Sequence, residues 1–111
     1  MATNVELSTR AENVCDKLEV TGTKESNMIY KAIERTERHL KENVHFGDAV
    51  AKRLIPLPYK QEGVTNLFRV SLPCYWRLVY TLRRENMTCI VFILDILSHK
   101  DYDKLFGYKK R

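Results

Sequence analysis

The chain has 111 residues, of which 44% are hydrophobic and 30% are charged. This length supports one small domain, residues 1–111, with a single core and no room for a second domain. The longest apolar run, Cys89 to Leu94, has the length of a buried strand and is too short to cross a bilayer. The first residues show no basic segment followed by an apolar one. We therefore expect no secretory signal, no membrane association and a cytoplasmic location.

The three cysteines predict neither disulfides nor zinc. Cys15, Cys74 and Cys89 are odd in number and widely spaced, and they form no CxxC or Cys/His cluster. No cluster of carboxylates offers a site to a hard cation either. We expect a chain that works without a metal ion or a cofactor.

Positive charge is concentrated in the second half of the chain. Residues 1–50 carry 7 Lys/Arg and 9 Asp/Glu, whereas residues 51–111 carry 12 and 5, within a formal net charge of +5. Such an asymmetry predicts a polyanionic partner: RNA, DNA or an acidic protein segment. A solvated basic surface would give the same pattern.

The first half predicts a short strand and two helices. Val5 and Leu7 alternate with polar residues, which is typical of a strand, and apolar residues then recur at helical spacing before Thr21. From residue 24 to about 43 the helical pattern is strong. Thr23 is placed to cap that helix, and Asn43 with the following glycine ends it.

The second half predicts a sheet. In chain order we expect a turn of helix at 48–51, a short strand at 53–55, a loop at 59–65, and strands at 67–72, 76–83 and 88–97. The strands are rich in Val, Ile, Leu, Phe and Tyr, so helices should cover at least one face of the sheet. The fold class is therefore α+β.

Two arginines and a histidine are predicted to share one face of this sheet. If Leu72 pairs with Trp76, Ser71 lies opposite Arg77, and Arg69 is the diagonal neighbour of Arg77. The apolar residues between them then face the helices. An antiparallel return of the last strand brings His99 toward the level of Arg77, and Tyr102 follows three residues later.

These side chains supply the parts for RNA cleavage by attack of a 2′-hydroxyl on the adjacent phosphate. Arg77 and Arg69 could bind phosphate oxygens bidentately, and His99 could transfer protons. Tyr102 could stack on a base, orient the phosphate or share the proton transfer. Taken singly, an exposed strand arginine is most often a solubility residue, and a lone histidine at a strand end most often makes a local hydrogen bond.

The order of segments resembles the RelE/ParE superfamily of toxins from prokaryotic toxin-antitoxin modules. The resemblance is carried by Asn66-Leu67-Phe68-Arg69-Val70, Trp76-Arg77-Leu78-Val79-Tyr80, a hydrophobic strand and His99-Lys100-Asp101-Tyr102. It implies two N-terminal helices packed on a twisted antiparallel sheet of about four strands, in the order βααβββ. It also implies metal-independent cleavage of messenger RNA at the ribosomal A site, and neutralisation by a cognate antitoxin.

The resemblance implies roles for individual residues. Arg77 corresponds to the phosphate-stabilising arginine of the family, and Arg69 to the first of two lysines whose second position falls on Ser71. His99 takes the place of an arginine in RelE-like toxins and of a histidine in YoeB-like toxins. Tyr102 approximates the tyrosine that follows, with Tyr108 competing for that role. The nearest candidate for the YoeB-like general-base glutamate is Glu62.

Further contacts to RNA are expected from a set of basic and aromatic residues: Lys52, Arg53, Lys60, Lys100 and Tyr108. Two other functions remain open. One is a ParE-like protein that poisons DNA gyrase by binding, and the other is a diverged, inactive RNA-binding or interaction protein of the same fold.

Overall fold

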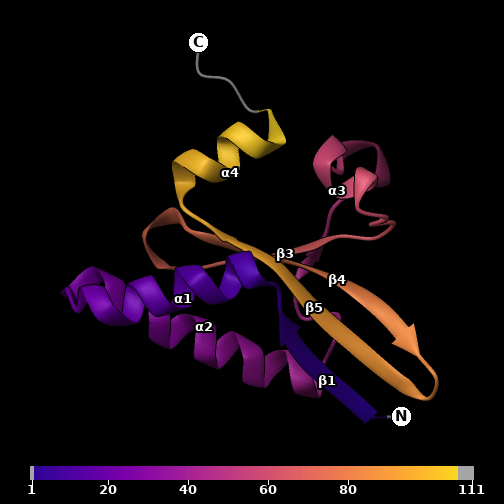
Figure 1. Cartoon of the computed structure of the whole chain (residues 1–111), viewed down its shortest axis with the longest axis horizontal. Coiled ribbons are helices and arrows are strands. Elements are labelled where there is room, and N and C mark those ends of the chain that lie inside the picture. The colour runs from indigo at the N-terminus through magenta and orange to yellow at the C-terminus, as the bar shows by residue number, and fades with distance from the viewer. Residues whose placement is uncertain (1, 108–111) are drawn as a thin grey trace.

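The computed structural model describes residues 2–107 and has an α+β architecture (Figure 1). This confirms the predicted fold class. The elements in chain order are β1 (Ala2–Leu7), α1 (Thr9–Thr21), α2 (Lys24–Glu42), β2 (Asp48–Ala49), the 3₁₀ turn η1 (Lys52–Leu54), α3 (Leu57–Gln61), β3 (Phe68–Ser71), the 3₁₀ turn η2 (Pro73–Tyr75), β4 (Arg77–Glu85), β5 (Thr88–Leu97) and α4 (His99–Phe106).

The described strands form one mixed sheet in the order β1-β5-β4-β3-β2. β1 pairs with β5 in parallel, and the other neighbours are antiparallel. The expectation of about four antiparallel strands in the order βααβββ is therefore wrong in both strand count and direction. Alternating side chains identify a strand but not its neighbour, and β1 finds its partner 86 residues later because Val5 and Leu7 pack into the same core as β5.

The end of α1 and both boundaries of α2 lie where the sequence predicts them, whereas the start of α1 was not predicted. The Thr23 hydroxyl accepts a hydrogen bond from the backbone N–H of Ser26 at the start of α2, and Ser8 does the same for Ala11 in α1. Such caps satisfy N–H groups that a helix leaves without an internal partner. Gly22 ends α1 in the left-handed conformation at φ 67°, which a glycine adopts without strain.

α1 and α2 bury one face of the sheet. The main core contains residues of both helices, of β3, β4 and β5, and of the β3–β4 connection: Ala11, Leu18, Ile29, Ala32, Ile33, Leu40, Val70, Leu72, Leu78, Tyr80, Val91, Ile93 and Ile96. Phe68 and Trp76 pack against this core from its rim. The predicted helix-facing side of the two central strands is thus confirmed.

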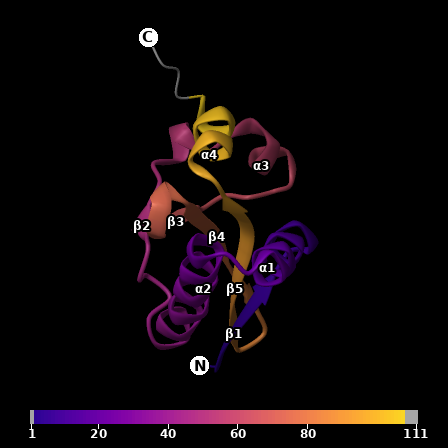
Figure 2. The ribbon, with the colours of Figure 1, turned by 90° about the vertical axis from the view of Figure 1, so that its left-hand side faces the viewer.

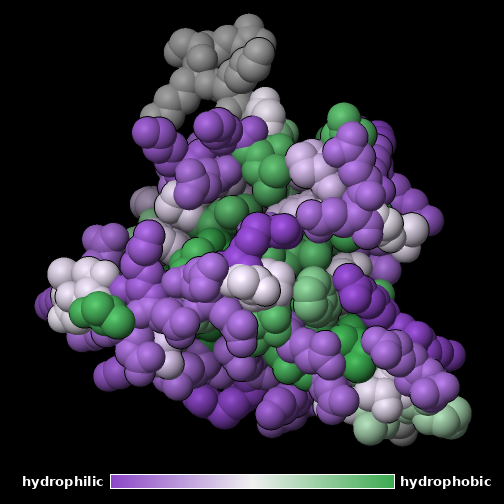
Figure 3. All heavy atoms as spheres, viewed as in Figure 1, coloured by the Kyte–Doolittle hydropathy of each residue, from purple (hydrophilic) through white to green (hydrophobic). Residues whose placement is uncertain are grey.

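A second, smaller core covers part of the opposite face. It is built from Ile55, Tyr59, Val64, Leu67, Val79, Leu94 and Tyr102. α3 and α4 supply its outer layer at the end of the molecule away from the N-terminus (Figure 2). Apolar side chains remain visible in the hollow between α4 and α1 (Figure 3). Two short helices therefore cover part of the face that carries the arginines. The sequence predicted neither helix.

Three local predictions between residues 48 and 65 are wrong. Residues 48–51 contain β2 and not a turn of helix, residues 53–55 lie in and after η1 and not in a strand, and the predicted loop at 59–65 begins within α3. β2 is stabilised by pairing with Arg69 and Phe68, about twenty residues away. Contacts at that range leave no trace in the local pattern.

A β-bulge at Leu94 shapes the second face. Val79 pairs with Asp95 and Tyr80 pairs with Ile93, so Leu94 is an extra residue in β5. Leu94 packs in the second core, and the next residue, Asp95, bonds to Tyr59 and Arg10. Bulges redirect side chains in this way, because they break the strict alternation of a strand.

Candidate functional site

The register that places the two arginines is the one the sequence predicts. Ser71 pairs with Arg77, and Arg69 pairs with Val79 two residues along the same two strands. The backbone N–H of Leu72 donates to the carbonyl oxygen of Trp76 at 2.8 Å and closes the connection between β3 and β4. Arg69 and Arg77 are consequently diagonal neighbours on the face opposite α1 and α2.

Tyr102 lies between the two guanidinium groups. Arg69 Nη1 donates a hydrogen bond of 2.7 Å to Tyr102 Oη, and the Cζ atom of Arg77 lies 5.4 Å from the centre of the Tyr102 ring. The Arg77 guanidinium is also held by a 3.1 Å hydrogen bond from Nη1 to the carbonyl oxygen of Trp76. One tyrosine thus orients one arginine through its hydroxyl and contacts the other through its ring.

Tyr102 is more deeply buried than the two arginines. Its side chain is only 3% exposed and stacks on Phe106, whereas Arg69 and Arg77 are half-buried. α4 holds Tyr102 in place because Ser98 caps the helix by accepting from the N–H of Asp101. The buried Tyr102 is therefore in a position to support both guanidinium groups.

His99 is the first residue of α4 and lies one helical turn before Tyr102. Its imidazole is 52% exposed, with Nε2 3.3 Å from a carboxylate oxygen of Asp103 and the ring centre 5.8 Å from that of Tyr75. His99 therefore shares a helix with the residue that the arginines contact. Its own contacts within the described chain are to Asp103 and Tyr75.

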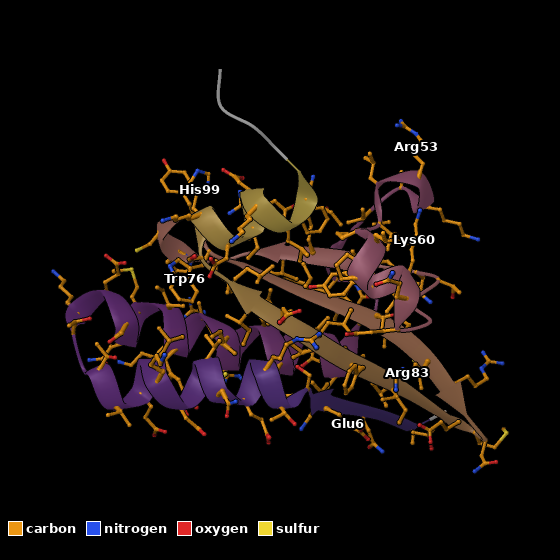
Figure 4. All side chains as sticks on the ribbon, turned by 45° about the horizontal axis from the view of Figure 1, so that its top comes forward. Glu6, Arg53, Lys60, Trp76, Arg83 and His99 are labelled. Carbon is orange, nitrogen blue, oxygen red and sulfur yellow. The ribbon has the colours of Figure 1, made fainter. Side chains whose placement is uncertain are left out.

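Three of the predicted RNA-binding residues gather at one hollow. Lys52, Arg53 and Lys60 line a depression of about 440 Å³ together with Ile55, Val64 and Thr65. Figure 4 shows Arg53 and Lys60 at one end of the view and His99 at the other. Lys100 is exposed on α4. Tyr108 lies outside the described residues.

A second polar cluster escaped the sequence analysis. Asp95 accepts two hydrogen bonds from Arg10, at 3.0 and 3.2 Å, and one from the Tyr59 hydroxyl at 2.7 Å. Glu62 accepts from Arg10 at 3.3 Å, so the candidate general base belongs to this cluster. The single signal for it was a carboxylate inside the apolar strand 88–97.

Contacts and burial within this cluster shift the pKa values of two of its members. The hydrogen bond to Asp95 raises the pKa of Arg10, and burial, followed by the hydrogen bond to Asp95, raises the pKa of Tyr59. Both groups line a hollow of about 580 Å³, together with Lys104 and Leu105 of α4. The hydrogen bonds that Arg10 and Tyr59 donate to Asp95 tie α1, α3 and β5 together.

Two absences concern residues 2–107 alone. No group of three or more His, Cys, Asp or Glu side chains in this range could hold a metal ion. None of the helices in the same range is long and apolar enough to cross a membrane. Neither finding bears on residue 1 or residues 108–111.

Comparison of the chain with models of known protein families and with curated proteins gave no match. The resemblance to RelE/ParE toxins therefore stays a prediction that rests on the residues quoted above.

Proposed function

We propose that this chain is a toxin of RelE/ParE type that cleaves messenger RNA at the ribosomal A site without a metal ion and is neutralised by a cognate antitoxin. The observation that carries the proposal is the cluster of Arg69, Arg77 and Tyr102, with His99 one turn earlier on α4. Guanidinium groups stay protonated and bind phosphate oxygens in a forked geometry, which suits an RNA backbone.

Arg77 and His99 have the direct roles in the proposed reaction. The ribose 2′-hydroxyl attacks the adjacent phosphorus, the bond to the 5′-oxygen breaks, and a 2′,3′-cyclic phosphate remains. Arg77 binds the phosphate oxygens on which charge develops, and His99 moves the proton from the attacking to the leaving oxygen. Asp103 lies beside this imidazole, with a carboxylate oxygen 3.3 Å from His99 Nε2.

Arg69 and Tyr102 have supporting roles in the proposal. Arg69 adds positive charge beside Arg77, and Tyr102 positions both guanidinium groups. The hollow of Lys52, Arg53 and Lys60 would hold more distant phosphates of the same strand. Contacts of this kind make binding depend on salt concentration, since each neutralised phosphate releases counterions.

Induced expression of an Arg77→Ala variant tests the proposal. Expression of the wild-type chain should stop translation, and sequencing of RNA 5′ ends should show cuts within codons on ribosomes. Arg77→Ala should restore growth, because the phosphate loses its principal charge partner. His99→Ala should restore it as well, through loss of proton transfer.

Arg84→Ala is the matched control, since Arg84 is an exposed arginine of the same strand near the β4–β5 turn. It should leave growth arrest and RNA cuts unchanged. Circular dichroism must show that all variants fold. Equal toxicity of the wild type and the two site variants would exclude this mechanism.

The alternative functions are favoured by a different observation. Tyr102 is buried, and His99 is paired with Asp103, so these groups are already engaged inside the protein. Such engagement suits a ParE-like binder of DNA gyrase or a diverged RNA-binding or interaction protein, neither of which needs proton transfer. DNA breaks and an SOS response with initially intact translation would indicate the gyrase poison. Growth unaffected by expression would indicate the interaction protein.

A further inference from the structure

Tyr75 occupies a strained and exposed position in the β3–β4 connection. Cys74 and Tyr75 have φ values of 61° and 64°, so two successive residues with side chains adopt the left-handed conformation. This conformation is unfavourable for residues other than glycine, and it persists where the surrounding structure enforces it. Within this connection Tyr75, a large aromatic residue, is 72% exposed.

The Tyr75 ring stands beside His99 without being covered by it. The two ring centres are 5.8 Å apart and the planes are inclined by 56°, which leaves ring surface of Tyr75 open. The other exposed aromatic next to a histidine is arranged differently: Phe46 lies flat on His39, with centres 4.6 Å apart and planes inclined by 9°. Of these two pairs, only Tyr75 and His99 leave an aromatic face open next to an imidazole.

The pair adjoins the phosphate-binding groups proposed above. Tyr75 is two residues before Arg77, and His99 is three residues before Tyr102, whose ring contacts Arg77. The connection between β3 and β4 and the first turn of α4 thus bring an aromatic face, an imidazole and a guanidinium to one part of the surface. A nucleotide has matching parts, since an unpaired base stacks on aromatic rings while its phosphate binds arginine.

We infer that Tyr75 and His99 form a stacking site for one unpaired base of single-stranded RNA, beside the phosphate held by Arg77. The inference rests on the proposed function, because Arg77 supplies the phosphate contact. It adds a determinant of substrate binding that the RNA backbone alone would not provide. Because every base has a flat aromatic face, the site should tolerate different bases and require that the base be unpaired.

Binding to two matched oligonucleotides tests the inference. The first is a short adenine oligoribonucleotide with 2′-O-methyl groups, which cannot be cleaved because the attacking hydroxyl is blocked. The second has the same backbone and no bases. The full chain should bind the first more tightly, and Tyr75→Leu should weaken that binding roughly 10- to 100-fold, the usual effect of losing one stacked base. Binding of the abasic strand should not change.

Two control variants make the test specific. Tyr75→Phe keeps the aromatic face and should bind both strands as the wild type does. Phe46→Leu removes the covered aromatic residue of the other pair and should also have no effect. Equal binding of the two strands by the wild type, or equal effects of Tyr75→Leu on both, would overturn the stacking site.

The same experiment separates this inference from the proposed function. Arg77→Ala should weaken binding of both strands, because both carry the phosphates. If Arg77→Ala leaves both affinities unchanged while Tyr75→Leu still weakens the adenine strand, the phosphate role fails and the stacking site stands. If the wild-type chain binds neither strand, the stacking site fails, whereas the proposed function is decided separately by the growth arrest and the RNA 5′ ends.

Discussion

Arg69 in β3 and Tyr102 in α4 are joined by a 2.7 Å hydrogen bond across 33 residues of chain. This bond connects the helix that carries His99 to the strand beside Arg77. Tyr102 is also part of the second core, so the position of α4 depends on polar and apolar contacts of one side chain. Tyr102, the most deeply buried residue of the candidate site, thus holds the other parts of the site together.

The first prediction concerns the Tyr102 hydroxyl. Tyr102→Phe removes the acceptor of Arg69 and keeps the ring that Arg77 contacts. A hydrogen bond to a charged group contributes about 1.5–3 kcal/mol, and the free energy of unfolding should fall by about that amount. Urea unfolding measures it. Tyr30→Phe in α2, which is only half-buried, should change stability by less than about 0.5 kcal/mol.

The second prediction concerns the close approach at Gly47. A Cβ atom there would lie 2.8 Å from the carbonyl oxygen of Arg69 and 2.9 Å from the ring of Tyr80. Gly47 also donates to the Tyr80 hydroxyl, which in turn donates to the carbonyl oxygen of Val44. Gly47→Ala should therefore destabilise the protein by about 3 kcal/mol, as severe overpacking does.

Gly63→Ala is the control for that substitution. Gly63 has φ 85°, and no atom lies within 4 Å of an added Cβ. An alanine there would therefore have a strained backbone but would not clash with a neighbour. Its cost should be about 1 kcal/mol. Thermal unfolding of both variants compares the two costs, and equal losses would contradict the packing argument.

The third prediction concerns alkaline pH and Tyr59. Burial raises the pKa of its phenol above the ordinary value of 10.0, so the folded protein keeps the proton at a pH where the unfolded chain releases it. The unfolded state then binds fewer protons, and the free energy of unfolding should fall as pH rises above about 10.

Tyr59→Phe should make this fall shallower, because the titrating group is gone. At pH 7 the same variant should be less stable than the wild type by about 1.5–3 kcal/mol, since Asp95 loses a donor. Chemical denaturation across the pH range measures both effects. An unchanged slope above pH 10 would show that Tyr59 is not the group responsible.

The fourth prediction concerns thiol reactivity. Burial is the main cause that raises the pKa of Cys15, to about 11, whereas Cys74 is exposed in the β3–β4 connection. The thiolate is the reactive form, so iodoacetamide at pH 8 should modify Cys74 well before Cys15. Mass spectrometry of peptides from the folded protein gives the order, and prior labelling of Cys15 would contradict the structure.

Much of the helical layer and of the strand register was predictable from the sequence. Thr23 marks the start of α2 by a local hydrogen bond, and alternation along residues 67–72 and 76–83 separates the apolar face from Arg69 and Arg77. Both signals depend on neighbours within a few residues. Local chemistry is sufficient where an element begins, ends or alternates within its own length.

The two short helices that cover part of the arginine-bearing face were not predictable in this way. α3 and α4 are short, and Tyr59 and Tyr102 acquire their positions by packing against Val79 and Leu94 from distant strands. The bulge that directs Asp95 toward Arg10 likewise depends on pairing with β4. No local pattern encodes such contacts.

Periodicity and capping act over short distances, and they were sufficient to predict the α+β class, the two long helices, the three central strands and the face on which Arg69 and Arg77 lie. Long-range packing sets the parallel pairing of β1 with β5, the burial of Tyr102 between the arginines, and the position of His99 beside Tyr75 and Asp103. These outcomes depend on which surfaces the folded chain brings together, and that choice is made by packing across the whole domain.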